Sequence, residues 1–129
     1  MRLLLDTHVW LWWMLDSPRL SDATRSLVLD PGATVYFSAA SAWEIAIKYA
    51  TGKLALPAPP STYIPSRAEG GEFRIIDIRL EHALAVGSLP RHHDDPFDRL
   101  LLAQTIVEGF RFVTADRRLA SYDVDLITV

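Results

Sequence analysis

The 129-residue sequence predicts a three-layer α/β/α fold, with a mostly parallel central sheet of about five strands. Short apolar runs alternate along the chain with longer segments of helical periodicity, which is typical of repeated strand–helix–strand units. Polar residues follow several of the apolar runs directly, at the strand ends where such sheets bind ligands. The length supports one hydrophobic core, so we expect a single domain over residues 1–129.

The first half of the chain is predicted to form two strands and four helices. The opening apolar run suits a buried strand, and the helix after it is apolar nearly all round. Ser21 is a typical helix N-cap, while Gly52 and Gly70 are typical stops. The expected strands cover residues 2–5 and 34–37, and the expected helices cover residues 7–15, 21–29, 39–51 and 61–69.

The second half is predicted to add three strands and three helices. The segment Asp95-Pro96 has the typical form of a helix start, and Gly109 is a typical helix end. Apolar runs rich in Phe, Val and Ile mark the strands. The expected strands cover residues 73–76, 110–113 and 126–129, and the expected helices cover residues 80–87, 96–108 and 117–121.

Composition excludes several classes of protein. The chain has no cysteine, which rules out a disulfide scaffold, a thiol nucleophile and a thiolate zinc site. A net charge of −3 argues against a simple basic nucleic-acid-binding module. Asp6 and His8 interrupt the apolar N-terminus, which is too short to span a bilayer, so we expect a cytoplasmic protein with no membrane association.

Four carboxylates stand out because each follows a strand or lies in the first turns of a helix. They are Asp6, Glu44, Asp98 and Asp116. Converging carboxylates repel one another and are expensive to bury, and a divalent cation resolves that repulsion. Oxygen ligands of this kind suit Mg²⁺ or Mn²⁺.

Each of these acids also has an ordinary structural explanation. Asp6 can cap the first helix, and Glu44 can pair with the lysine four residues later. Asp95 and Asp98 fit the start of a helix, and Asp116 suits a first helical turn. The position of all four at the ligand-binding edge of the predicted sheet favours a shared site.

Other candidate sites are weaker. His92 and His93 are neighbours in a loop, which predicts a solvated surface rather than a zinc site. Neither a G-x-S-x-G elbow nor a glycine-rich phosphate loop occurs. Trp10, Trp12 and Trp13 predict core packing, and the helix that carries them either is buried within the chain or presents one side to a partner.

Four segments, taken in order, resemble the PIN-domain family and within it the VapC-type toxins of bacterial toxin–antitoxin pairs. They are LLLDTHVWLWW, SAASAWEIAIKYATGKLALP, HHDDPFDRLLLAQ and VTAD, and together they extend over essentially the whole chain. The resemblance implies a PIN-like three-layer fold and a Mg²⁺- or Mn²⁺-dependent endoribonuclease. The family's four acids fall on Asp6, Glu44, Asp98 and Asp116, which are thereby implied to be catalytic metal ligands.

The resemblance also assigns supporting roles. Thr114 matches a polar residue that supports the site. Asp95 matches an aspartate that we take to cap the helix predicted over residues 96–108 and to support the site from behind its ligands. Arg99 and Arg117 are candidate contacts for RNA phosphates, with structural ion pairs as the alternative. We expect water, activated by carboxylate-bound Mg²⁺ or Mn²⁺, to hydrolyse the RNA in line and leave a 5′-phosphate.

The implied partners are an RNA substrate, a cognate VapB-type antitoxin and a second copy of the chain in a homodimer. DNA would be bound only through the antitoxin. A non-catalytic PIN-fold module that binds RNA or a partner is the alternative hypothesis. An acidic receiver-like domain is disfavoured, because the sequence lacks paired acids after the first strand and a lysine after Val113.

Overall fold

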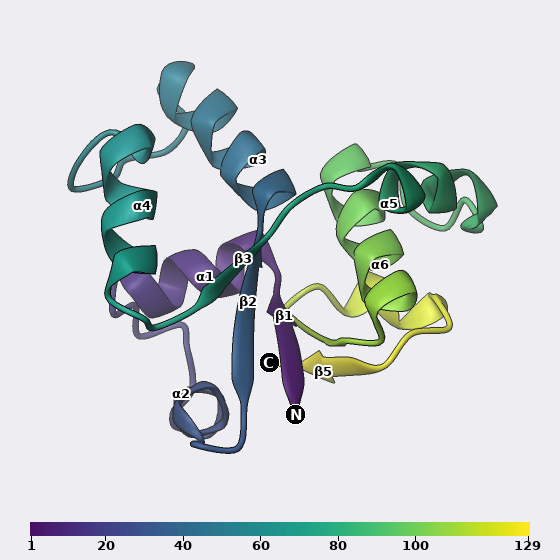
Figure 1. The fold of residues 1–129 in the computed structure, drawn as a ribbon, viewed down its shortest axis with the longest axis horizontal. Helices are drawn as coiled ribbons and strands as arrows, with labels where there is room; N and C mark the ends of the chain where they lie inside the picture. Colours follow the sequence, from purple (N-terminus) through teal and green to yellow (C-terminus); the bar gives the residue numbers. More distant parts are fainter.

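The computed structural model describes all 129 residues and contains one five-stranded sheet whose strands are all parallel. The strand order is β3-β2-β1-β4-β5, which places β1 in the centre (Figure 1). Helices cover both faces of the sheet, so the predicted three-layer α/β class is confirmed. The strands are β1 (Arg2–Leu5), β2 (Thr34–Ser38), β3 (Arg74–Ile76), β4 (Arg111–Thr114) and β5 (Leu126–Thr128).

The helices alternate with these strands along the chain. The α-helices are α1 (Thr7–Met14), α2 (Asp22–Leu29), α3 (Ala39–Ala50), α4 (Pro60–Glu69), α5 (Leu80–Ala85) and α6 (Pro96–Glu108). Two 3₁₀ helices, η1 (Val86–Ser88) and η2 (Arg117–Ser121), complete the set. None of the helices combines the length and the hydropathy that a membrane span requires.

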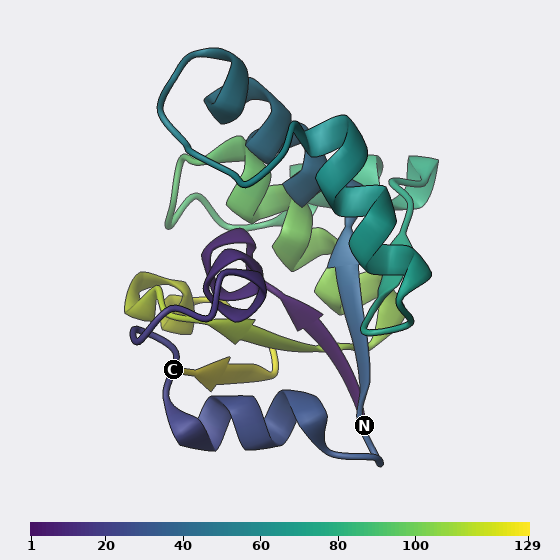
Figure 2. The same cartoon turned by 90° about the vertical axis from the view of Figure 1, so that its left-hand side faces the viewer.

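The central strand β1 serves both layers because successive side chains point to opposite faces. Leu3 and Leu5 pack into a core with residues of α1, α2 and α4, whereas Leu4 packs into a second core with α6. Figure 1 shows α1, α2 and α4 on one side of the strands and α5 and α6 on the other, and Figure 2 views the molecule from the side of α2. All three leucines are fully buried, so β1 is fixed in place from both sides.

The aromatic residues of α1 divide between core and surface. Trp10 is fully buried and its ring lies 4.3 Å from that of Phe37, with Phe73 and Tyr63 edge-on. Trp12 and Trp13 are only partly buried. The predicted core role is therefore confirmed for Trp10, and α1 keeps an apolar side that is open to solvent.

Most predicted elements are present with ends displaced by a residue. Two differences matter for the site. The strand predicted over residues 34–37 extends to Ser38, and the one predicted over residues 110–113 runs from Arg111 to Thr114. The helix predicted over residues 80–87 breaks into α5 and η1, where Gly87 disfavours α-helix. Because β2 and β4 each end one residue later than predicted, their last residues, Ser38 and Thr114, are buried polar side chains at the carboxyl ends of these strands.

Candidate active site

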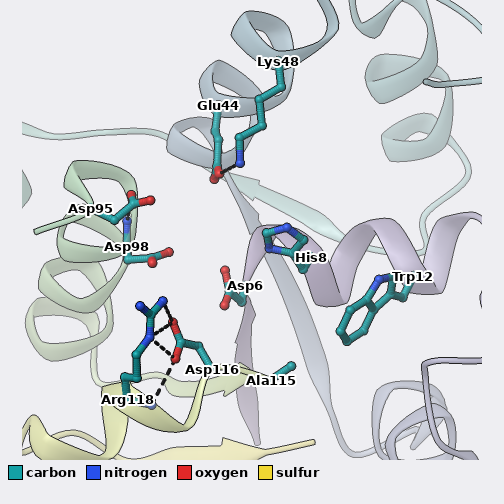
Figure 3. Close-up of a pocket in the computed structure, with 10 residues that line it drawn as sticks. All are labelled: Asp6, His8, Trp12, Glu44, Lys48, Asp95, Asp98, Ala115, Asp116 and Arg118. Carbon is teal, nitrogen blue, oxygen red and sulfur yellow. Dashed lines mark hydrogen bonds and ion pairs between the residues drawn. The ribbon is translucent and has the colours of Figure 1, made fainter. Parts of the chain in front are cut away.

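A pocket of about 410 Å³ opens at the carboxyl end of the sheet (Figure 3). All four acids predicted from the sequence line it, brought there by the end of β1, by α3, by α6 and by the segment after β4. The full lining is Asp6, His8, Trp12, Glu44, Lys48, Asp95, Asp98, Ala115, Asp116 and Arg118. The topology explains the convergence, because β1 and β4 are neighbours and their carboxyl ends meet at one edge.

Asp6 is both a helix cap and a wall of the pocket. Its Oδ1 accepts the backbone N–H of Thr7 at 2.7 Å, and its Oδ2 accepts the hydroxyl of Thr114 at 2.6 Å. The side chain is buried at the base of the site, and this burial raises the pKa of Asp6 despite the two hydrogen bonds. The carboxylate is thus held rigidly, with no lysine or arginine beside it.

Glu44 enters the pocket from the second turn of α3. Its Oε1 accepts the hydroxyl of Thr7 at 2.8 Å, and its Oε2 lies 2.5 Å from the ammonium of Lys48. The same Thr7 hydroxyl also contacts Ser41 at 2.8 Å. The predicted helix pair with Lys48 is therefore present, yet Glu44 is buried in the pocket and is not a surface residue. Glu44 therefore forms the ion pair with Lys48 and also belongs to the candidate site.

Asp98 projects from the first turn of α6. Asp95 caps that helix by accepting the backbone N–H groups of Phe97 and Asp98, as its sequence position predicts. Burial, reinforced by the negative charge of Asp6, raises the pKa of Asp98 to about 6. Its Oδ2 lies 2.7 Å from Nε2 of His93, a contact that opposes the rise. The expectation that His93 is a solvated loop residue is wrong, because its side chain is only 12% exposed.

Asp116 forms the fourth side of the pocket and is held by Arg118. The guanidinium donates to both carboxylate oxygens at 2.7–3.2 Å, and these bonds lower the pKa of Asp116. Thr114 Oγ1 accepts the backbone N–H of Asp116 at 3.0 Å while donating to Asp6. One buried hydroxyl thereby positions two of the four acids relative to each other.

The charges in the pocket do not balance. Its lining includes five carboxylates, and Lys48 and Arg118 are the only full cations facing them. Both cations are committed to a single acid each, so Asp6 and Asp98 have no such partner. The donor set is hard, oxygen-rich and negatively charged, which fits a divalent cation rather than an organic cofactor.

Two predicted RNA contacts lie outside this pocket. Arg99 donates to the carbonyls of Val86, Leu89 and Pro90, so its guanidinium fastens the loop before α6. This supports the structural alternative for Arg99, whose contact with RNA phosphate stays a prediction. Arg117 is exposed and makes no side-chain hydrogen bond, while its neighbour Arg118 is the arginine that faces the acids.

Comparison with known proteins agrees with the fold. The PIN domain model matches residues 3–125. Ribonuclease VapC22 from Mycobacterium tuberculosis is 34% identical over 120 residues, which are 92% of this chain and 90% of the relative.

Solved structures show the same fold. A chain of VapBC2 from Rickettsia felis, bound to a promoter DNA fragment, aligns over 99% of this chain and 98% of its own with a TM-score of 0.73 at 16% identity. A chain of a toxin–antitoxin complex from Klebsiella pneumoniae aligns over 98% and 96% with a TM-score of 0.63 at 17% identity. Fold, acids and relatives agree, and this chain belongs to the PIN-domain family, among its VapC-type members.

Proposed function

We propose that this protein is a Mg²⁺- or Mn²⁺-dependent endoribonuclease that acts in the cytoplasm as the toxin of a toxin–antitoxin pair, with residues 1–129 working as one PIN domain. The observation that carries the proposal is the convergence of Asp6, Glu44, Asp98 and Asp116 in one pocket with too little positive charge. The relative named as a ribonuclease supports RNA as the substrate class.

We assign the four acids two tasks. Asp6, Asp98 and Asp116 would hold the cation, and Glu44 would serve as a further ligand or orient a water molecule. The chemistry that such an ion supplies when bound is neutralisation of phosphodiester charge and activation of an attacking water. Thr114 and Thr7 keep Asp6 and Glu44 in fixed positions, which reduces the reorganisation needed during the reaction.

The two cations at the pocket rim are suited to RNA. Lys48 and Arg118 flank the acids from opposite sides and each has a partly or largely exposed side chain, 39% and 71% respectively. Arginine in particular binds phosphate oxygens in a bidentate manner. We assign both residues to the phosphate groups next to the scissile bond, which attract them away from their carboxylate partners as the substrate enters.

The test is cleavage of a mixed RNA pool by the purified protein with Mg²⁺ or Mn²⁺, followed by mapping of the new 5′ ends. We expect cuts at defined positions that disappear with EDTA and with Asp98→Asn, while Asp94→Asn, an exposed neighbour outside the pocket, keeps full activity. Cutting that survives Asp98→Asn would contradict the proposal. RNA bound tightly but left intact by the wild-type protein would favour the non-catalytic binding module.

The proposal includes a VapB-type antitoxin and a homodimer. A groove of about 440 Å³ between α1, α2 and α4 is lined by the apolar side chains of Trp13, Met14, Val28 and Leu29 and by equal numbers of basic and acidic residues, namely Arg25, Arg67, Asp16 and Glu72. The apolar part of this groove suits the apolar face of an amphipathic antitoxin segment. The solved neighbours named as VapBC and toxin–antitoxin complexes support this partner, and any DNA contact would come through it. Light scattering of the free chain and of the pair tests both assemblies.

A further inference from the structure

A histidine that is not part of the pocket lining contacts two of the pocket's carboxylates. His93, from the loop before α6, places Nε2 at 2.7 Å from Asp98 Oδ2 and 4.0 Å from Asp116 Oδ2. One ligand atom from each of these three residues lies within 4.8 Å of the other two. They are the tightest group of metal-ligating side chains in the chain, and Asp6 does not join it at this distance.

These separations match those of ligands around one octahedral ion. Donor atoms at about 2.1 Å from a cation are about 3 Å apart when adjacent and about 4.2 Å apart when opposite. The contact of His93 with Asp98 has the length expected of adjacent ligands, and its distance to Asp116 approaches that of opposite ones. A cation that takes the place of the proton shared by His93 and Asp98 would lie close to donor atoms of all three side chains.

The loop that carries His93 is fastened to the body of the domain. Arg99 donates to the carbonyl oxygens of Pro90 and His93 and to the hydroxyl of Tyr122. Asp95 secures the other end of the loop by capping α6. The imidazole is therefore held against Asp98 by its backbone as well as by their direct contact, as a preformed ligand would be.

We propose that His93 Nε2 is a direct ligand of the catalytic cation, in addition to the carboxylates assigned to it above, of which Asp98 and Asp116 are nearest to His93. The inference deepens the proposed function and rests on the metal site that it contains. Imidazole nitrogen suits transition-metal ions, whereas Mg²⁺ prefers oxygen donors and keeps much of its water. The site is thereby biased towards Mn²⁺ over Mg²⁺.

Two other histidines provide matched controls. His8 also lines the pocket, on the side of Asp6, but it is exposed and makes no hydrogen bond with any of the acids. His92 is adjacent in sequence and packs its ring against Tyr122, away from the carboxylates. Replacement of either by glutamine removes an imidazole near the site without changing the three-residue group.

The experiment measures Mn²⁺ binding rather than turnover. Pulsed electron paramagnetic resonance of Mn²⁺ bound to the full chain reports ¹⁴N nuclei in its coordination sphere. We expect the ¹⁴N coupling of a coordinated imidazole in the wild-type protein, in His8→Gln and in His92→Gln, and its loss in His93→Gln. Calorimetry should show Mn²⁺ affinity falling on the order of 10- to 100-fold in His93→Gln, with a smaller change for Mg²⁺.

The possible results separate this inference from the proposed function. Mn²⁺ that binds to the wild-type protein without coordinated ¹⁴N overturns the role of His93 and leaves the carboxylate site intact. Coupling lost in His8→Gln instead of His93→Gln overturns it equally. A wild-type protein that binds neither Mn²⁺ nor Mg²⁺ overturns both. Where His93→Gln folds poorly, a ¹⁴N coupling kept in both His8→Gln and His92→Gln assigns the coordinated imidazole to His93, because the fourth histidine, His82, is fully buried.

Discussion

Replacement of Asp98 by asparagine should stabilise the metal-free protein. The Asp98 carboxylate is buried beside the charge of Asp6 and has no lysine or arginine partner, so the folded state is strained electrostatically when Asp98 is ionised. Asparagine has nearly the same shape, keeps a polar contact with His93 and removes the charge. We therefore expect Asp98→Asn to increase the free energy of unfolding, although it removes an acid that the proposed cleavage requires.

The size of the effect follows from the shift in pKa. Asp98 titrates at about 6 in the folded chain against its ordinary value of 3.8, a rise of roughly two pKa units. At about 1.4 kcal/mol per unit, ionisation of Asp98 destabilises the folded state by about 3 kcal/mol at neutral pH. Because the folded state binds the proton more tightly, this destabilisation is complete above pH 6 and disappears as the pH falls towards 4.

Urea unfolding in EDTA measures the difference directly. Asp98→Asn should exceed the wild type by about 3 kcal/mol at pH 7.5, with the difference shrinking towards zero near pH 4. Asp94→Asn changes an exposed aspartate in the loop before α6, and its free energy of unfolding should match that of the wild type at both pH values. An Asp98→Asn protein that is less stable than the wild type at pH 7.5 would refute the reasoning.

Three further predictions concern groups that hold the acids in place. Thr114→Val removes the hydroxyl that donates to Asp6 and should lower the free energy of unfolding, measured in urea, by about 1–3 kcal/mol. Thr114→Ser keeps a hydroxyl and should retain most of the wild-type stability. Arg99→Lys loses the forked contacts that fasten the loop, so amide exchange over residues 89–93 should accelerate; unchanged exchange would contradict the structural role. Arg118→Gln should raise the pKa of Asp116 towards its ordinary value, as followed by NMR titration in EDTA.

Placement of the four acids could be predicted because it depends on local patterns and one topological rule. Asp6 follows a run of leucines, and Asp98 stands three residues after a helix cap, so the ends of these elements are visible in the sequence. The rule that parallel strands gather ligands at their carboxyl ends then brings Asp116 beside Asp6. Local patterns together with this rule therefore suffice to place the acids in one pocket.

The remaining site residues depend on contacts that local patterns do not contain. His93 contacts Asp98 in a loop that Arg99 holds through backbone carbonyls, and these contacts are not visible in the local sequence pattern. Arg118, in place of Arg117, faces the acids because η2 is a 3₁₀ helix that begins with Asp116 as its cap. The direction in which the Arg117 and Arg118 side chains point is therefore not visible in the sequence pattern.

The central claim is hydrolysis of RNA by water at this carboxylate pocket, and the chemistry of the cut tests it most directly. The measurement uses the wild-type protein, Mn²⁺ and an oligoribonucleotide with a single 2′-deoxy substitution on the 5′ side of a mapped cleavage site. We expect this substrate to be cut at the same site and to yield a 5′-phosphate on the downstream fragment, because water is the nucleophile. Loss of cleavage, with a 2′,3′-cyclic phosphate from the unmodified RNA, would contradict it.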